Sequence, residues 1–425
     1  MTESMKKRVA ELFAGVGGFR VGLDALDSGW DFVYANQWEP GKKRQYAFDC
    51  YAKHFGNDEE LSNEDINQVD KTTIPDMELL VGGFPCQDYS VAHSGAQGIQ
   101  GKKGVLWWDI RDTIEAKMPA FVLLENVDRL LSSPGKANRG RDFGMILFTL
   151  HQLGYGAQWR VINAAEYGFP QRRRRVFIFA YRKDTRYFKT LDNSVNLKDA
   201  LINHSVYNEA LPIERNLHLE KETRLDGYVD IVDFSNTFSF HFENTGIMHD
   251  WDIFTGKYTP KYDGKHVTLN DIVLDHVDDD SLYIDNTPGR REKFEYLKGA
   301  KKEKRTTSDG FEYFYAEGGM AFPDPLDRPG RTMLTSEHSV NRSTHVIADK
   351  ETGKLRILAP IECERLQTFP DNWTEGMPKS MRYFVMGNAL VCGLIGKIGQ
   401  GIDKIIANED DIEPLKPQVV NKIKH

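Results

Sequence analysis

The stretch that most constrains this chain is a short apolar segment that ends in glycine, proline and cysteine. Residues 79–81 (Leu-Leu-Val) have the length and composition of a buried strand, and two glycines with Pro85 end it. Cys86 therefore follows the carboxyl end of a strand, which is where open α/β sheets bind ligands. Because Pro85 fixes its own φ and restricts Phe84 to extended backbone, the main chain sets the direction of the thiol. Cys86 is thus a candidate nucleophile, and a buried structural cysteine is the alternative.

Composition places the chain among ordinary globular proteins. Its 425 residues, 40% hydrophobic and 28% charged, suffice for a large core and suggest two domains. We find no apolar run long enough to cross a membrane, and residues 1–8 leave no room for the apolar core of a signal peptide. The four cysteines show neither metal-ligand spacing nor a disulfide framework, so we expect no metal site and a cytoplasmic, reducing location. The net charge of -8 argues against a protein that coats nucleic acid but allows one that grips it locally.

A glycine-rich turn follows the first predicted strand, residues 9–13. Glycines in such a turn let a ligand approach the backbone, and a helix is expected directly after it. The turn lacks the GxGxxG pattern of dinucleotide-binding proteins, and a strand-to-helix turn without a ligand would look the same. The residues of the turn are Ala14, Gly15, Val16, Gly17, Gly18 and Phe19, directly after Phe13.

Polar and aromatic side chains follow the second predicted strand, residues 32–35. Gln37 could hold a ribose and Trp38 could stack on an adenine, although a surface tryptophan at a strand end is equally consistent. Asp65 and Ile66 precede the third predicted strand and could face the same ligand. A lone Asp at such a place is more often a helix cap.

A carboxylate and a run of arginines mark the second half of the predicted sheet. Glu125 follows a buried strand at 120–124, where it could donate a proton or pair with an arginine. Residues 172–175 are four consecutive arginines that lead into another strand. Because alternate strand residues point to opposite faces, Arg173 and Arg175 share one face. That pair could face an anion or a base, whereas most charged runs are simply solvated.

The character of the chain changes between residues 183 and 325, which are polar with few helical periods. Eight Lys or Arg against three Glu lie between Arg290 and Arg305, and aromatic residues are interleaved. This pattern predicts a second domain whose surface could follow a phosphate backbone, with a solvated charged helix as the alternative. Apolar residues at helical spacing then predict a last helix that begins near residue 387.

Six motifs in this order resemble those of the cytosine-5 DNA methyltransferases. They are residues 13–19 (Phe-Ala-Gly-Val-Gly-Gly-Phe), 83–87 (Gly-Phe-Pro-Cys-Gln), 125–127 (Glu-Asn-Val), 171–175 (Gln-Arg-Arg-Arg-Arg), 328–332 (Arg-Pro-Gly-Arg-Thr) and 387–388 (Gly-Asn). Any one of them could arise by chance, so their order and spacing carry the resemblance. It covers nearly the whole chain outside residues 183–325.

The resemblance implies an α/β fold with the mostly parallel, Rossmann-like sheet of an S-adenosylmethionine-dependent methyltransferase and a smaller target-recognition domain. It implies a catalytic and cofactor-binding domain at 1–182, completed by 380–425, with target recognition and connecting segments at 183–379. The implied activity is methyl transfer to carbon 5 of a flipped-out cytosine in a specific duplex sequence, for protection from restriction. S-adenosylhomocysteine would be the product. Double-stranded DNA and a separately acting cognate restriction endonuclease are the implied partners, and the chain is expected to be a monomer.

The resemblance also implies roles for individual residues. Cys86 would be the nucleophile, Glu125 the cytosine reader and acid, and Arg173 and Arg175 the cationic pair of the pocket. The residues that would bind the cofactor are Phe13, Ala14, Gly15, Val16, Gly17, Gly18, Phe19, Gln37, Trp38, Asp65, Ile66, Pro85, Leu106 and Asn388.

Two positions depart from the family pattern. Glu11 stands where the family usually has Asp, and Gln37 stands where it usually has the Glu that binds the ribose, a role that Glu39 could take instead. The alternatives to a DNA methyltransferase are an RNA methyltransferase on the same scaffold, an NAD-dependent oxidoreductase and a catalytically silent DNA-binding regulator. The long middle segment argues against the RNA methyltransferase, and the missing GxGxxG pattern argues against the oxidoreductase. The few residues before the first strand argue against the regulator.

Overall fold

The computed structural model describes residues 5–58, 60–84, 106–135, 138–307 and 310–409. The chain divides into two units. Unit 1 comprises residues 1–163, 174–263 and 392–425, and unit 2 comprises residues 164–173 and 264–391.

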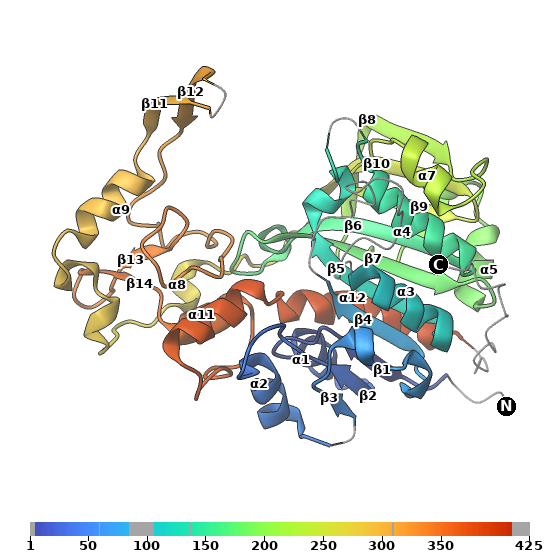
Figure 1. Cartoon of the computed structure of the whole chain (residues 1–425), viewed down its shortest axis with the longest axis horizontal. Coiled ribbons are helices and arrows are strands. Elements are labelled where there is room, and N and C mark those ends of the chain that lie inside the picture. The colour runs from blue at the N-terminus through green and yellow to red at the C-terminus, as the bar shows by residue number, and fades with distance from the viewer. Residues whose placement is uncertain (1–4, 59, 85–105, 136–137, 308–309, 410–425) are drawn as a thin grey trace. The chain divides into compact units, whose positions relative to one another are not determined.

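A ten-stranded sheet forms the centre of unit 1 (Figure 1), with the order β3-β2-β1-β4-β5-β7-β6-β9-β10-β8. Neighbours from β3 to β5 are parallel, β7 runs against both β5 and β6, and the pairs from β6 to β8 are antiparallel. Six of the seven strands from β3 to β6 therefore run in one direction, which confirms the expected α/β class. The strands are β1 (Arg8–Leu12), β2 (Asp31–Asn36), β3 (Leu61–Ser62), β4 (Leu79–Gly83), β5 (Phe121–Val127), β6 (Tyr155–Asn163), β7 (Arg174–Arg182), β8 (Ile213–Arg224), β9 (Thr245–His249) and β10 (Asp252–Pro260).

The apolar strands predicted from the sequence are central strands of this sheet. Residues 79–81 of β4 and 121–124 of β5 are buried because both faces of the parallel half are covered. Trp107 of α3 and Phe143 of α4 belong to the same hydrophobic core as Leu80. The helices of unit 1 are α1 (Gly18–Asp24), α2 (Tyr46–Phe55), α3 (Leu106–Lys117), α4 (Arg141–Gln152), α5 (Arg186–Asp192), α6 (Leu197–Asn203), α7 (Ile231–Thr237) and α12 (Cys392–Ile406).

Close contact between α1 and α12 joins the two ends of unit 1. A Cβ atom built on Gly22 would lie 2.5 Å from the carbonyl oxygen of Cys392, and one built on Gly399 would lie 2.7 Å from Leu23. Gly22 is required because a side chain there would meet backbone and force the helices apart, whereas a side chain at Gly399 would have to displace the leucine side-chain ends that contact it. The glycines that would weaken a free helix here serve close backbone packing.

The division between the units differs from the domain boundary expected from the sequence. Residues 183–263 were expected in the second domain, but β8, β9 and β10 extend the unit 1 sheet from β6. The chain returns to unit 1 at Cys392 rather than near residue 380, because α11 belongs to unit 2. The last helix accordingly begins at Cys392, and residue 387 lies near the end of α11.

Unit 2 has a small core and a buried charge network. Arg356 is fully buried, donates to Asp349 at 3.1 Å and donates to Glu362 at 2.8 Å. Breaking such a network by removing one partner is strongly destabilising, so it fixes the surrounding segments. The elements of unit 2 are α8 (Leu269–Ile272), α9 (Arg290–Lys298), β11 (Lys301–Thr306), β12 (Glu312–Glu317), β13 (Val346–Ala348), β14 (Leu355–Ile357), α10 (Pro360–Leu366) and α11 (Lys379–Asn388).

The sequence predicts no apolar run long enough to cross a membrane, but one segment of the described chain does have the length and apolar composition of a membrane span. The segment is Lys379–Ile406, in which α11 and α12 lie. Of its most apolar stretch of 18 residues, 67% is buried within the protein. The core helices of globular proteins have the same length and composition.

Candidate active site

The carboxyl ends of four neighbouring strands meet at one edge of the sheet. Leu12 at the end of β1 pairs with Asn36 of β2 and with Gly82 of β4, and Gly83 pairs with Glu125 of β5. All four strands are parallel, so the segments that follow them leave the sheet side by side. The glycine turn, the Gln37 segment and the Gly83 segment therefore share this edge with Glu125, as the sequence predicted.

Glu125 forms an ion pair at this edge. Its Oε1 lies 2.8 Å from Nε of Arg175 on the antiparallel strand β7, and both side chains are largely buried. Its other oxygen lies against the end of β4, since a Cβ built on Gly83 would be 3.3 Å from Oε2 and 4.0 Å from the ring of Phe19. The carboxylate is thus held beside the strand that leads to Cys86.

Asn126 fixes the backbone just before the predicted nucleophile. Its buried Nδ2 donates to the carbonyl oxygen of Phe84 at 2.8 Å, while its Oδ1 accepts from the N–H of Val127. Pro85 and Cys86 lie outside the described residues. The side chain of Asn126 therefore ties β5 to the last described residue before them, a positioning role that its place in the Glu-Asn-Val motif alone did not reveal.

The other cysteines are poor candidates for a nucleophile. Cys50, Cys363 and Cys392 are all buried. Burial raises the pKa of the Cys363 and Cys392 thiols well above the usual value, so neither ionises readily.

The glycine turn adopts backbone conformations that suit glycine. Gly15 and Gly17 have φ of 57° and 87°, and a Cβ on Gly17 would lie 2.4 Å from the ring of Phe55. A Cβ on Gly15 would meet nothing within 4 Å, so the turn is open on that side. Phe13 also has a positive φ, 56°, which is uncommon for a large side chain and marks a constrained turn.

The side chains of Gln37 and Glu39 accept hydrogen bonds from different parts of the backbone. The N–H of Gly15 donates to Oε1 of Gln37 at 2.7 Å, so this side chain braces the glycine turn. Oε2 of Glu39 accepts from the N–H of Ala47 at 3.5 Å, near the start of α2. Trp38, between them, is 37% exposed and offers a ring face at the same edge.

Asp65 and Ile66 lie one strand further along. Asp65 caps a 3₁₀ turn by accepting from the N–H of Asn67 at 3.1 Å, and Ile66 is buried. Asn36 ties this segment to β2, since its Nδ2 donates to the carbonyl oxygen of Glu64 at 3.0 Å. Leu106 begins α3 and packs on the core of unit 1.

Arg173 and Asn388 belong to unit 2. The guanidinium of Arg173 is 2% exposed and donates to the carbonyl oxygens of Met333, Gly387 and Asn388. Exposure along the arginine run alternates as expected, with residues 172 and 174 exposed. Arg173 thus holds the Gly-Asn motif, whereas Arg175 holds Glu125.

Glu11 is a buried acid under the glycine turn. It is 0% exposed, and Tyr51 donates to its Oε2 at 3.2 Å. Burial raises its pKa from 4.5 to about 8, against the lowering effects of the Tyr51 hydrogen bond and Arg20. The folded protein therefore holds this proton at neutral pH.

We expect the free energy of unfolding to fall between pH 5 and pH 8 in the wild type, and to fall less in Glu11→Gln. The folded state binds a proton that the unfolded state has released in this window, so each step up in pH favours unfolding, by roughly 5 kcal/mol in all. Urea denaturation at pH 5.5, 7 and 8.5 measures the free energy of unfolding of both proteins. The exposed Glu60→Gln is the control, and parallel curves for wild type and Glu11→Gln would contradict the assignment.

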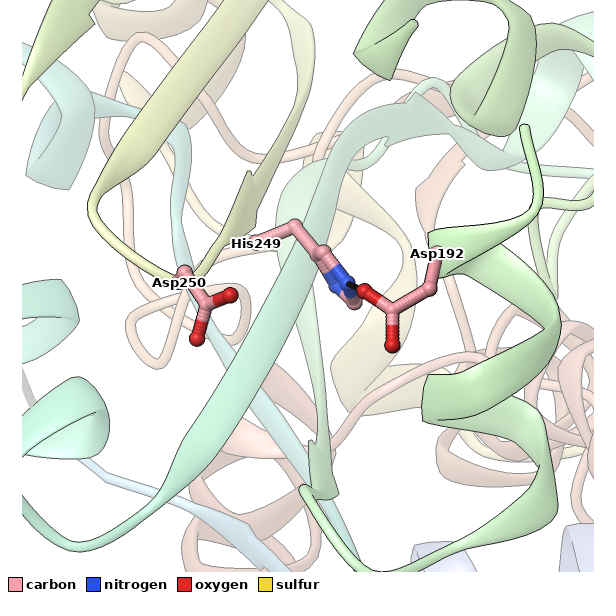
Figure 2. Close-up of side chains that lie close together, drawn as sticks. All are labelled: Asp192, His249 and Asp250. Atoms are coloured by element: carbon pink, nitrogen blue, oxygen red, sulfur yellow. Dashed lines mark hydrogen bonds and ion pairs between the residues drawn. The ribbon is translucent and has the colours of Figure 1, made fainter. Parts of the chain in front are cut away.

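Three potential metal ligands, Asp192, His249 and Asp250, lie together elsewhere in unit 1 (Figure 2), with ligand atoms within 4.8 Å of one another. Nε2 of His249 is 2.8 Å from Asp192, and Nζ of Lys183 is 3.0 Å from Asp250. Protein groups thus pair with Nε2 of His249 and with Asp250, while Nδ1 of His249 is buried without a hydrogen-bond partner among the described residues.

Comparisons with known proteins agree with the geometry. A family model described as C-5 cytosine-specific DNA methylase matches residues 7–404. The chain is 53% identical over 412 residues to the Type II methyltransferase M.Sau3AI of Staphylococcus aureus, covering 96% of this chain and 98% of that protein. It is 33% identical over 227 residues to the Type II methyltransferase M.HhaI of Haemophilus parahaemolyticus, covering 51% and 64%.

Solved structures show the same fold. DNMT2 of Spodoptera frugiperda matches with a TM-score of 0.59 at 13% identity, over 94% of this chain and 99% of that chain. Dnmt2 of S. pombe matches with a TM-score of 0.58 at 14% identity, over 94% and 98%. From its family match and its curated relatives, the chain belongs to the C-5 cytosine-specific DNA methylase family and is a DNA (cytosine-5-)-methyltransferase.

Proposed function

We propose that this enzyme transfers a methyl group from S-adenosylmethionine to a flipped-out cytosine, with Cys86 as nucleophile and Glu125 as acid. The observation that carries the proposal is the Glu125–Arg175 pair, held against Gly83 three residues before Cys86. Carbon 5 of cytosine is a poor nucleophile and the ring is stacked in the duplex, so the base must leave the stack first.

The residues at the sheet edge fit the cofactor. The open side of Gly15 leaves room for a ligand against the backbone, and the exposed ring of Trp38 suits an adenine. Oε1 of Gln37 is already bound to Gly15, which leaves its amide N–H groups for the ribose hydroxyls. Ile66, Pro85 and Leu106 would complete the site, with Asp65 acting through its cap, and the family resemblance implies a cofactor contact for Asn388 as well. When bound, S-adenosylmethionine supplies an electrophilic methyl group.

The protein groups would act in sequence on the cytosine. The Cys86 thiolate adds to carbon 6, and Glu125 as the carboxylic acid hydrogen-bonds ring nitrogen 3 and protonates it. The enamine so formed makes carbon 5 nucleophilic. After methylation, a base from the solvent accepts the carbon 5 proton, the freed electron pair re-forms the double bond to carbon 6 and the Cys86 thiolate leaves. The proton on ring nitrogen 3 returns to Glu125. Arg175 steadies the charge that develops beside Glu125, and Arg173 acts by holding the Gly387–Asn388 backbone.

Unit 2 is proposed to recognise the DNA sequence around the target. The name of the relative M.Sau3AI supports a place in a Type II restriction system, with a cognate endonuclease that acts separately. A monomeric methyltransferase in the cytoplasm is part of the same proposal. Bisulfite sequencing of plasmid DNA from cells that express the protein tests the function. A recurring methylated cytosine context is the expected result, and unmodified plasmid with methylated tRNA would contradict it.

We expect Gln37→Ala to weaken the glycine turn and Gln37→Glu to leave it braced. Both oxygens of a carboxylate accept, so Gln37→Glu keeps the bond from Gly15 but loses the amide donors. Equilibrium binding of S-adenosylhomocysteine by calorimetry should show about a 3- to 10-fold loss for Gln37→Ala, roughly one hydrogen bond. An unchanged affinity in both variants would assign the ribose contact to another side chain.

A further inference from the structure

The hairpin of β11 and β12 projects from the end of α9 in unit 2 (Figure 1). Its two strands form a sheet of their own, paired from Lys301–Glu317 to Thr306–Glu312. An isolated two-stranded hairpin is marginally stable in water, so its position must be fixed by contacts on at least one face.

One face of the hairpin is anchored to the rest of unit 2. The hydroxyl of Tyr296 on α9 donates to Glu303 at 3.0 Å, and Lys301 lies over the Tyr296 ring at 4.2 Å. Arg342 lies 3.4 Å from Glu317 on the same face. These contacts orient the hairpin and leave the opposite face outward.

The outer face carries Lys302, Lys304, Thr306, Glu312, Phe314 and Ala316, which the strand register places together. Every one of these residues is exposed, whereas residues 301, 303, 315 and 317 of the anchored face are partly buried. Two contacts on the outer face join its own members. Lys304 lies 2.6 Å from Glu312, and Lys302 lies 5.4 Å from the centre of the Phe314 ring.

Aromatic side chains gather on this element. Among the described residues, five aromatic side chains are exposed, and four of them lie on α9 or the hairpin. They are Tyr296 (63%), Phe311 (68%), Tyr313 (39%) and Phe314 (65%). The lysines on an edge strand often have no role other than to prevent pairing with a strand of another chain. Exposed phenylalanines on the same two strands would instead promote such pairing. Protection of an edge therefore does not explain the hairpin.

We propose that the outer face of the β11–β12 hairpin binds duplex DNA, with Lys302 and Lys304 on phosphates and Phe314 against the groove wall. A two-stranded ribbon fits the major groove, about 12 Å wide, and strands serve as readers in other DNA-binding proteins. Lys304 exchanges Glu312 for a phosphate when the duplex binds. The inference rests on the proposed function and names the surface of unit 2 that meets the substrate.

The test is the dissociation constant of the full-length protein for a fluorescein-labelled duplex with the methylated context, measured by anisotropy from 50 to 300 mM salt. The double variant Lys302→Ala/Lys304→Ala should bind about 10-fold more weakly at 150 mM salt, and its log–log salt slope should flatten by about 2. Phe314→Ala should bind about 3- to 10-fold more weakly with an unchanged slope. Glu312→Gln should bind more tightly, a gain that damage to the fold would not produce.

A matched control is available in unit 1. Lys257 and Lys261 are exposed, and Lys261 pairs with Glu214 at 3.5 Å as Lys304 pairs with Glu312. Lys257→Ala/Lys261→Ala should bind like the wild type. Equal weakening in the control, or wild-type binding by all three hairpin variants, would overturn the proposal. A hairpin change that alters mass by light scattering but not DNA affinity would also overturn it, since the face would then join two copies.

The hairpin proposal and the proposed function fail differently. A wild-type protein that methylates no cytosine refutes the function whatever the hairpin variants do. A wild-type protein that methylates normally while the hairpin variants bind normally refutes only the hairpin.

Discussion

Methyl transfer is expected to fall by about 10⁴-fold or more when Cys86 is replaced by alanine. Without the thiolate no bond forms to carbon 6 of cytosine, so carbon 5 never gains the electron density it needs. A duplex with 5-fluorocytosine at the target makes the step visible, because fluorine cannot leave as the carbon 5 proton does. Wild-type enzyme with S-adenosylmethionine should give a covalent complex that survives denaturing electrophoresis, and Cys86→Ala should give none.

The other cysteines supply the control for this experiment. Cys50→Ala removes a thiol buried in α2 and should leave the covalent complex intact. Binding of the duplex by Cys86→Ala should stay close to the wild-type value, which separates lost chemistry from lost folding. A covalent complex formed by Cys86→Ala would refute the assignment of the nucleophile.

Glu125→Gln is expected to slow methyl transfer by about 10²- to 10⁴-fold, the usual contribution of a general acid. The amide keeps the volume of the side chain but has no acidic proton for ring nitrogen 3. It also replaces the charged partner that Arg175 holds at 2.8 Å. The measurement is the single-turnover rate at saturating DNA and cofactor, so that weaker binding does not enter.

A neighbouring ion pair gives the matched control. Arg174, next to Arg175 on β7, lies 3.1 Å from Asp128, the first residue after β5, and both side chains are exposed. Asp128→Asn removes the same charge and should leave the rate within about 3-fold, since an exposed pair contributes little. A single-turnover rate for Glu125→Gln above half the wild-type rate would remove Glu125 from the chemistry.

The residues at the sheet edge could be predicted from sequence because the end of each strand is visible in the sequence. Apolar runs stop at Gly, Gln or Glu, and parallel strands necessarily bring those ends together. Glu125 beside the Gly83 segment follows from that rule alone. The alternation of Arg173 and Arg175 also followed from strand geometry, and the burial pattern agrees with it.

Contacts between distant side chains and backbone could not be predicted. Asn126 reaches the Phe84 carbonyl 42 residues away, and Gln37 reaches the Gly15 N–H 22 residues away. Nothing in either residue's local sequence specifies its partner. Strand β9 was missed for another reason, because all five of its residues are buried although Thr245 and His249 are polar, so no alternation marks it.

The packing of α1 against α12 sets the order in which the enzyme can mature. Helix α1 begins directly after the glycine turn, and α12 supports it from a point more than 350 residues later in the chain. On the ribosome, unit 2 is synthesised before α12, so the turn lacks this support until residues 392–406 have been made. We therefore expect a nascent chain without α12 to be inactive, and a chain cut near residue 391 to depend on α12 supplied as a separate peptide.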